Sequence, residues 1–168
     1  MRDKFLCVMA QFDKETEEKL GGIYKELLKA GFVGNQTPYL PYHITLGTFE
    51  LEKENELKEL LKKVASNTSK IQVSFNHIGL FGMEVLFAAP SVSHELLNIQ
   101  ENFNSSYAND LTWAPHTTII IDKPEVIQKA IPIATDSFYS FSGYIESISL
   151  YEFWPTRFIS EEKLIEDF

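Results

Sequence analysis

Two four-residue stretches limit the folds that this chain can adopt. They are HITL at residues 43–46 and HTTI at residues 116–119, and both have the order histidine, any residue, threonine, aliphatic residue. Alternate side chains of a β-strand share a face, so on a strand each histidine points the same way as its threonine. The aliphatic residues then point to the opposite face, where they can be buried. The stretches therefore predict two strands, each with one polar and one buried face.

The surrounding pattern places the two stretches at equivalent points of the chain, because the order strand, helix, strand, helix occurs twice. We expect the whole chain, residues 1–168, to form one domain, or two intimately packed lobes, in which strands and helices are mixed throughout. Strands are expected at 4–12, 42–50, 70–81, 84–90 and 115–121, with a final hairpin over 144–159 that turns at 154–157. Helices are expected at 13–31, 54–64, 91–103 and 122–131.

Capping residues support two of these helices. Asp13 is a candidate N-cap for the first helix, and Gly31 is a candidate stop. Asp122 and Glu125 have the spacing of a capping box at the start of the last helix.

The composition excludes several classes of protein. Cys7 is the only cysteine, which rules out an internal disulfide and favours a reducing, cytoplasmic location. The apolar run near the start is too short to cross a membrane. Net charge is −9, and residues 85–168 contain 4 basic against 12 acidic residues, so a basic stripe for double-stranded DNA or long RNA is absent. Only Arg2 and Arg157 could supply a guanidinium group to a ligand.

The chemistry of the two motifs indicates phosphoryl transfer. If the strands lie side by side, His43, Thr45, His116 and Thr118 converge on one small anion. One histidine can act as general base and the other as general acid near neutral pH. Threonine hydroxyls donate hydrogen bonds to phosphate oxygens. No carboxylate or cysteine stands at ligand spacing from either histidine, so neither metal nor cofactor is expected.

The paired motifs resemble those of the 2H phosphoesterase superfamily, which includes 2'-5' RNA ligase-like proteins and cyclic phosphodiesterases. Pro115 directly before the second histidine and the ending IESISLYEF followed by RFI are also similar to that family. The resemblance implies a bilobed α+β fold of two similar halves with antiparallel sheets around a central cleft, each lobe supplying one motif. It also implies metal-independent chemistry on 2',3'-cyclic or 2'-5' linked phosphodiesters of nucleotides or short RNA. A monomer is expected.

Other functions and contacts remain open at this level. The same motifs would suit 2'-5' RNA ligation, degradation of a cyclic oligonucleotide, or nucleotide binding without catalysis. Tyr39 and Trp113 flank the motifs and could stack on a base, or they could form the wall of the cleft or part of the core. Tyr151 could face either the cleft or the core. Arg157 could hold a phosphate, although an ion pair with a surface carboxylate is the alternative.

Overall fold

The computed structural model describes residues 3–103 and 113–166. Its strands are β1 (Phe5–Phe12), β2 (His43–Phe49), β3 (Ile71–Phe81), β4 (Val85–Pro90), β5 (Thr117–Ile121), β6 (Phe141–Phe153) and β7 (Arg157–Lys163). Its helices are α1 (Lys14–Lys29), α2 (Glu54–Ala65), α3 (His94–Glu101) and α4 (Pro124–Ser137), with a short 3-10 turn at Leu51–Lys53.

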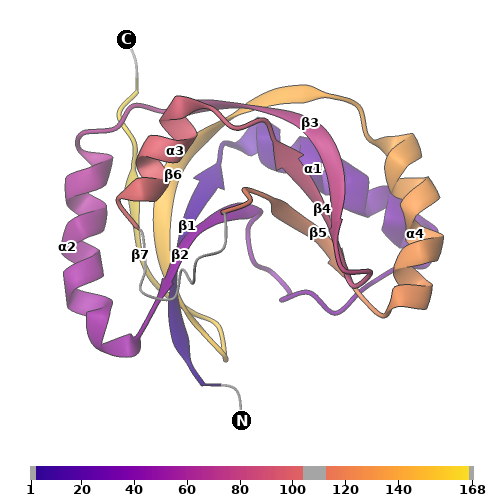
Figure 1. Cartoon of the computed structure of the whole chain (residues 1–168), viewed down its shortest axis with the longest axis horizontal. Coiled ribbons are helices and arrows are strands. Elements are labelled where there is room, and N and C mark those ends of the chain that lie inside the picture. Colours follow the sequence, from indigo (N-terminus) through magenta and orange to yellow (C-terminus); the bar gives the residue numbers. More distant parts are fainter. Residues whose placement is uncertain (1–2, 104–112, 167–168) are drawn as a thin grey trace.

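Within the described part of the chain, the seven strands form one sheet whose neighbouring strands are antiparallel. The order is β2-β1-β6-β3-β4-β5, and β7 pairs with the second half of β6. Figure 1 shows that the long strands β3 and β6 bend into an arch. Because of this curvature, β2 and β5 contact each other although they stand at opposite ends of the strand order. The fold thereby joins the two motif-bearing strands.

Strand β1 is buried on both faces, which explains its almost unbroken apolar sequence. Leu6, Val8 and Ala10 pack into the main core that the helices cover. Cys7 and Met9 point the other way and form a second, smaller cluster with the end of β6. This second face of β1 adjoins the motif side chains of β2, because Met9 is directly opposite Thr45.

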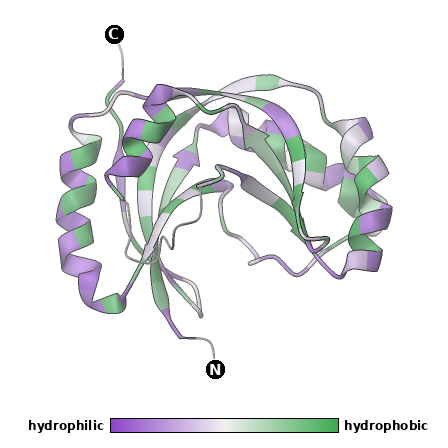
Figure 2. Ribbon diagram, in the orientation of Figure 1, coloured by the Kyte–Doolittle hydropathy of each residue, from purple (hydrophilic) through white to green (hydrophobic). Residues whose placement is uncertain are grey.

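The helices form the outer layer. Figure 1 shows α1 and α4 on one side of the arch and α2 on the other, and Figure 2 shows green apolar residues alternating with purple polar ones along them. Asp13 caps α1 as predicted, since its carboxylate accepts a hydrogen bond from the Thr16 backbone N–H at 3.0 Å. Gly31 has a φ of 92° and follows the end of the helix, as expected of a glycine stop. No described helix is long and apolar enough to cross a membrane.

The predicted start and end of the last helix were wrong. Asp122 accepts from the Lys123 backbone N–H at 2.8 Å, and the N-cap position is Lys123, which makes no side-chain capping bond. The helix runs on to Ser137 with Pro132 in its interior. A proline lacks a backbone donor, yet burial of one face of α4 against the core compensates for this loss.

The expected fold class is confirmed, because the chain is a mixed α+β protein with an antiparallel sheet. The division into two similar lobes, the monomeric state and the cytoplasmic location stay predictions.

Candidate active site

The two histidines are held in the same way. His43 is the first residue of β2, and its Nδ1 lies 2.8 Å from the carbonyl oxygen of Pro41. His116 directly precedes β5, and its Nδ1 lies 2.8 Å from the carbonyl oxygen of Ala114. In both motifs the partner is the carbonyl two residues earlier. This local hydrogen bond fixes the orientation of each ring relative to its strand.

The carbonyl partners also determine where each imidazole carries its proton. A carbonyl oxygen only accepts hydrogen bonds, so Nδ1 must be the protonated nitrogen in both rings. In a neutral ring Nε2 then has the lone pair and is available as a base. In a charged ring Nε2 has a proton to donate, and the carbonyl still accepts from Nδ1.

Both imidazoles have a pKa below the usual histidine range. Burial lowers the pKa of His43, the Pro41 carbonyl partly opposes this, and the charge of His116 lowers it further. Burial also lowers the pKa of His116, against the opposing effect of the Ala114 carbonyl. The charge of His116 can act on His43 because β2 and β5 contact each other.

Each of the two threonines directly precedes an extra residue, a β-bulge, in the pairing of its strand. Thr45 pairs with Met9 and Gly47 with Val8, so Leu46 is an extra residue on β2. In the same way, the pairing of β4 with β5 leaves Ile119, the residue after Thr118, as an extra residue on β5.

Each bulge therefore falls at the fourth position of a motif. Leu46 and Ile119 are both 1% exposed. Their burial explains why this position needs an aliphatic side chain in both motifs. Bulges of this kind redirect neighbouring side chains and are frequent beside active sites.

A hollow of about 830 Å³ brings three of the four motif side chains together. His43, Thr45 and Thr118 contribute to its wall. His116 stands beside this wall, where its ring centroid is 4.6 Å from that of Phe81 and 5.2 Å from that of Phe87. The two aromatic rings thus flank His116 on one side.

Trp113 joins the two motifs. Its indole N–H donates to the Thr45 carbonyl oxygen at 3.0 Å, and its ring packs against the main core. Trp113 lies three residues before His116, so this bond holds the segment that leads into β5 against the middle of β2. Trp113 therefore has a structural role beside the site, and its ring is used for packing.

The other three predicted contacts differ in their relation to the hollow. Tyr39 is fully exposed and lines it. Tyr151 packs against the cluster of Cys7 and Met9, which places it on the motif-bearing face of the sheet but outside the lining of the hollow. Arg157 donates to Glu152 at 2.8 Å and to Glu54 at 2.7 Å, so it forms the ion pairs given as the alternative to phosphate binding. Arg2 lies outside the described residues.

Several residues near the site carried no recognisable sequence signal. Phe81 and Phe87 flank His116 because β3, β4 and β5 are neighbours, a fact that only strand order provides. Gln11 is opposite His43 across β1 and β2, and its Oε1 accepts from the Ser149 hydroxyl at 2.7 Å. Trp154 lines the far end of the hollow.

Cys7 also lines the hollow, and its sulfur lies 3.8 Å from the Thr45 hydroxyl oxygen. Burial raises the pKa of the thiol to about 12, so it stays protonated at neutral pH and is a poor nucleophile.

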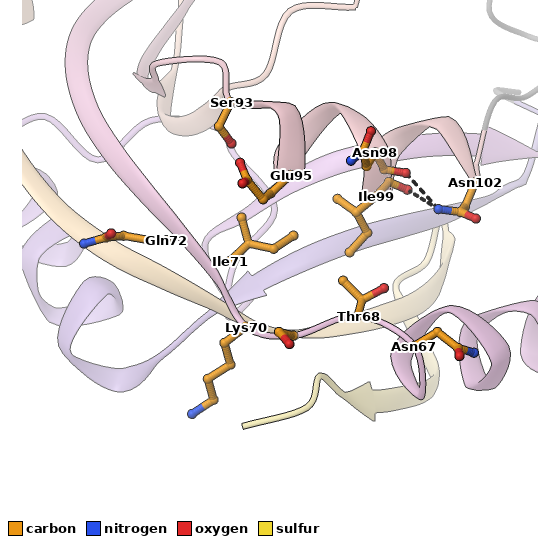
Figure 3. Close-up of a pocket in the computed structure, with 11 residues that line it drawn as sticks. Asn67, Thr68, Lys70, Ile71, Gln72, Ser93, Glu95, Asn98, Ile99 and Asn102 are labelled. Atoms are coloured by element: carbon orange, nitrogen blue, oxygen red, sulfur yellow. Dashed lines mark hydrogen bonds between the residues drawn. The ribbon is translucent and has the colours of Figure 1, made fainter. Parts of the chain in front are cut away.

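A second hollow, of about 660 Å³, lies between α3 and the segment that leads from α2 into β3 (Figure 3). Its described lining is largely polar, with amides such as Asn67, Asn98 and Asn102, and it contains none of the predicted site residues. Within residues 3–103 and 113–166, no three His, Cys, Asp or Glu side chains are grouped so that they could hold a metal ion.

Comparison with known proteins agrees with this arrangement. The family model described as "2'-5' RNA ligase superfamily" matches residues 30–153, a segment that contains both motifs. No curated protein matches the sequence significantly. The chain therefore belongs to the 2'-5' RNA ligase superfamily, whose members are 2H phosphoesterases.

Solved structures show the same fold. LigT of E. coli in its apo form superposes with a TM-score of 0.66 at 16% identity, covering 96% of this chain and 97% of LigT. TT0787 of Thermus thermophilus gives a TM-score of 0.67 at 14% identity, covering 98% of this chain and 100% of TT0787. LigT complexed with 3'-AMP gives 0.64 at 17% identity, covering 96% and 97%.

Proposed function

We propose that this protein is a metal-independent phosphodiesterase that hydrolyses 2',3'-cyclic or 2'-5' linked phosphodiesters of nucleotides or short RNA. The observation that carries the proposal is the matched pair of imidazoles, each bound through Nδ1 to a carbonyl and each left with Nε2 for chemistry. Family membership supports phosphoester chemistry. The complex of LigT with 3'-AMP supports a nucleotide as the ligand.

The two histidines divide the proton transfers between them. His43 in its neutral form takes a proton from water on Nε2 while the water oxygen attacks phosphorus. His116 in its charged form donates its Nε2 proton to the ribose oxygen as the bond from phosphorus to that oxygen breaks. His43 is assigned as the base because the charge of His116 lowers its pKa further and keeps it neutral. After one turnover the protons return through solvent.

The threonines stabilise the phosphate during this displacement. Thr45 and Thr118 line the hollow beside His43, and their hydroxyls donate to the two non-bridging oxygens. The imidazolium of His116 supplies positive charge next to these oxygens. In the opposite direction the same groups would catalyse joining, because each histidine would exchange its role.

The assignment of base and acid is tested with two kinds of substrate. We expect hydrolysis of adenosine 2',3'-cyclic phosphate, measured in EDTA, to fall about a hundredfold to ten-thousandfold in both His43→Ala and His116→Ala. An aryl phosphodiester has a leaving group that needs no proton. On that substrate His116→Ala should recover most of the activity, whereas His43→Ala should stay impaired.

Two outcomes would contradict the proposal. If His43→Ala, and not His116→Ala, recovered activity on the aryl phosphodiester, the roles of the two histidines would be the reverse of those proposed. Undiminished hydrolysis of the cyclic phosphate by both variants would remove the histidines from the chemistry.

A further inference from the structure

Two aromatic rings pack beside the histidine of the second motif. The ring centroid of Phe81 lies 4.6 Å from that of His116 and 4.5 Å from that of Phe87, and the centroids of Phe87 and His116 are 5.2 Å apart. The Phe81 ring is nearly perpendicular to the imidazole, at 85°, and the Phe87 ring is tilted by 56° against it. Rings at these separations are in contact and restrict one another.

The sheet register directs both phenylalanines to the face that carries the motif side chains. Strands β3, β4 and β5 are neighbours (Figure 1), and Phe87 is directly opposite Gly79 on β3 and Thr118 on β5. Phe81 is two residues after Gly79 and so points to the same face. A Cβ at Gly79 would lie 2.5 Å from the Phe87 ring, so this ring uses the space above the glycine.

The two phenylalanines contribute little to the apolar cores. Within residues 3–103 and 113–166, the side chains that form or pack against the two cores do not include Phe81 or Phe87. Phe81 is 40% exposed, although exposure of a large apolar side chain to water costs free energy. The opposite face of β4 carries Leu86 and Ala88, which are fully buried in the main core. The packing of the two rings is therefore directed at His116.

His116 needs this packing more than His43 does. The hydrogen bond between His43 and the Pro41 carbonyl is partly buried, whereas the bond between His116 and the Ala114 carbonyl is exposed. Water competes for an exposed hydrogen bond, so such a bond fixes a side chain only weakly. A general acid must hold its proton about 3 Å from the leaving oxygen. The imidazole of His116 therefore requires a second restraint.

We propose that Phe81 and Phe87 are positioning residues, which hold the His116 ring with Nδ1 on the Ala114 carbonyl and Nε2 directed at the leaving oxygen. The inference rests on the proposed function, in which His116 is the general acid. Neither phenylalanine has a group that transfers a proton, so both act only through His116. Their loss should impair proton donation and leave the attack of water on phosphorus intact.

Leaving groups of different basicity test this role. The double variant Phe81→Leu, Phe87→Leu keeps apolar side chains but removes both rings. It should lower kcat for adenosine 2',3'-cyclic phosphate about tenfold to a hundredfold, with KM changed less than about threefold, because the acid is misplaced. With an aryl phosphodiester, whose leaving group needs no proton, kcat should stay within about twofold of wild type. Equal losses on both substrates, or no loss on the cyclic phosphate, would overturn the proposal.

Two further variants separate positioning from a general effect of losing a ring. Phe81→Tyr keeps a ring at the exposed position and should restore most of the kcat that Phe81→Leu loses. Tyr139→Leu removes a ring that is 77% exposed between α4 and β6, and it should leave kcat unaltered on both substrates. A Phe81→Tyr variant as slow as Phe81→Leu, or an equal loss in Tyr139→Leu, would contradict a specific role of the ring.

Nitrogen NMR of the imidazoles gives a readout without turnover. At a pH at which both histidines are neutral, His116 of the wild type should be protonated at Nδ1 alone, and the double leucine variant should populate both tautomers. The signals of His43, assigned through His43→Ala, should not change and serve as the internal control. A His116 ring that keeps one tautomer in the double variant would overturn the proposal.

These measurements distinguish failure of the inference from failure of the proposed function. If His116→Ala hydrolysed the cyclic phosphate as fast as wild type, the proposed function would fail, while a change of tautomer in the double leucine variant would still support positioning of the ring. If His116→Ala were impaired and the double leucine variant were not, only the positioning role of the two phenylalanines would be refuted.

Discussion

At the scale of single residues, the two histidines are held alike, and their protonation should govern activity. Both have a pKa below 6.5, the usual value, mainly because they are buried. The reaction needs one charged and one neutral ring. We therefore expect kcat/KM to follow a bell-shaped curve with its maximum below pH 6.5, since above that pH the charged ring is lost.

This pH dependence is measured on adenosine 2',3'-cyclic phosphate at constant ionic strength. Because kcat/KM reports the free enzyme, a bound phosphate should move the kcat curve to higher pH by favouring charged imidazoles. A kcat/KM that continues to rise up to pH 8 would contradict the account.

Glu17 provides a second prediction at this scale. Burial raises the pKa of its carboxyl to about 7 against a usual 4.5, partly opposed by a hydrogen bond with the Tyr42 backbone. The folded state thus retains a proton that the unfolded state has released, so the free energy of unfolding falls as pH rises from about 4.5 to about 7. Glu17→Gln removes this titration and should stabilise the protein at pH 8 by about 1 to 3 kcal/mol.

The stability of Glu17→Gln is compared with wild type by thermal unfolding at pH 5 and pH 8. Glu18→Gln replaces an exposed neighbour and serves as the control. A stabilisation of equal size at both pH values, or one shared by Glu18→Gln, would exclude titration of Glu17 as the cause.

At the scale of strands and helices, sequence periodicity predicted most elements and both motif strands. The helix caps at Asp13 and Gly31 also followed from residue type. The extension of α4 past Pro132 could not be predicted, because tertiary packing outweighed a local breaker. The bulges at Leu46 and Ile119 were also hidden, since they depend on which strands are paired.

Contacts between strands give the prediction for this scale. A Cβ at Gly79 would lie 2.5 Å from the Phe87 ring, and Phe87 flanks His116. Gly79→Ala should therefore displace Phe87 and lower kcat/KM for the cyclic phosphate at least tenfold, while the protein remains folded. Such a loss would show that β3 acts on the site through β4.

Gly22→Ala in α1 is the matched control for Gly79→Ala. A Cβ there meets no atom within 4 Å, so the change should leave kcat/KM unaltered and add up to about 1 kcal/mol of stability. Wild-type activity in Gly79→Ala would show that the packing of Phe87 does not influence His116.

At the scale of the whole molecule, the candidate site exists because the sheet bends. β2 and β5 stand at the two ends of the strand order, and the arch formed by β3 and β6 brings them into contact (Figure 1). Trp113 fixes this junction by its bond to the Thr45 carbonyl. The motifs suggested that the histidines meet, but the closure of the sheet and the aromatic hollow beside it required the three-dimensional structure.

The central claim is that His43 and His116 form one catalytic unit, and a double-variant cycle tests it most directly. We would measure kcat/KM on adenosine 2',3'-cyclic phosphate in EDTA for wild type, His43→Ala, His116→Ala and the double variant. Groups that act as a unit are not additive, so the double variant should be little worse than the more damaged single variant. The claim would be contradicted if the loss of kcat/KM in the double variant equalled the product of the two single losses. It would also be contradicted if the double variant remained active.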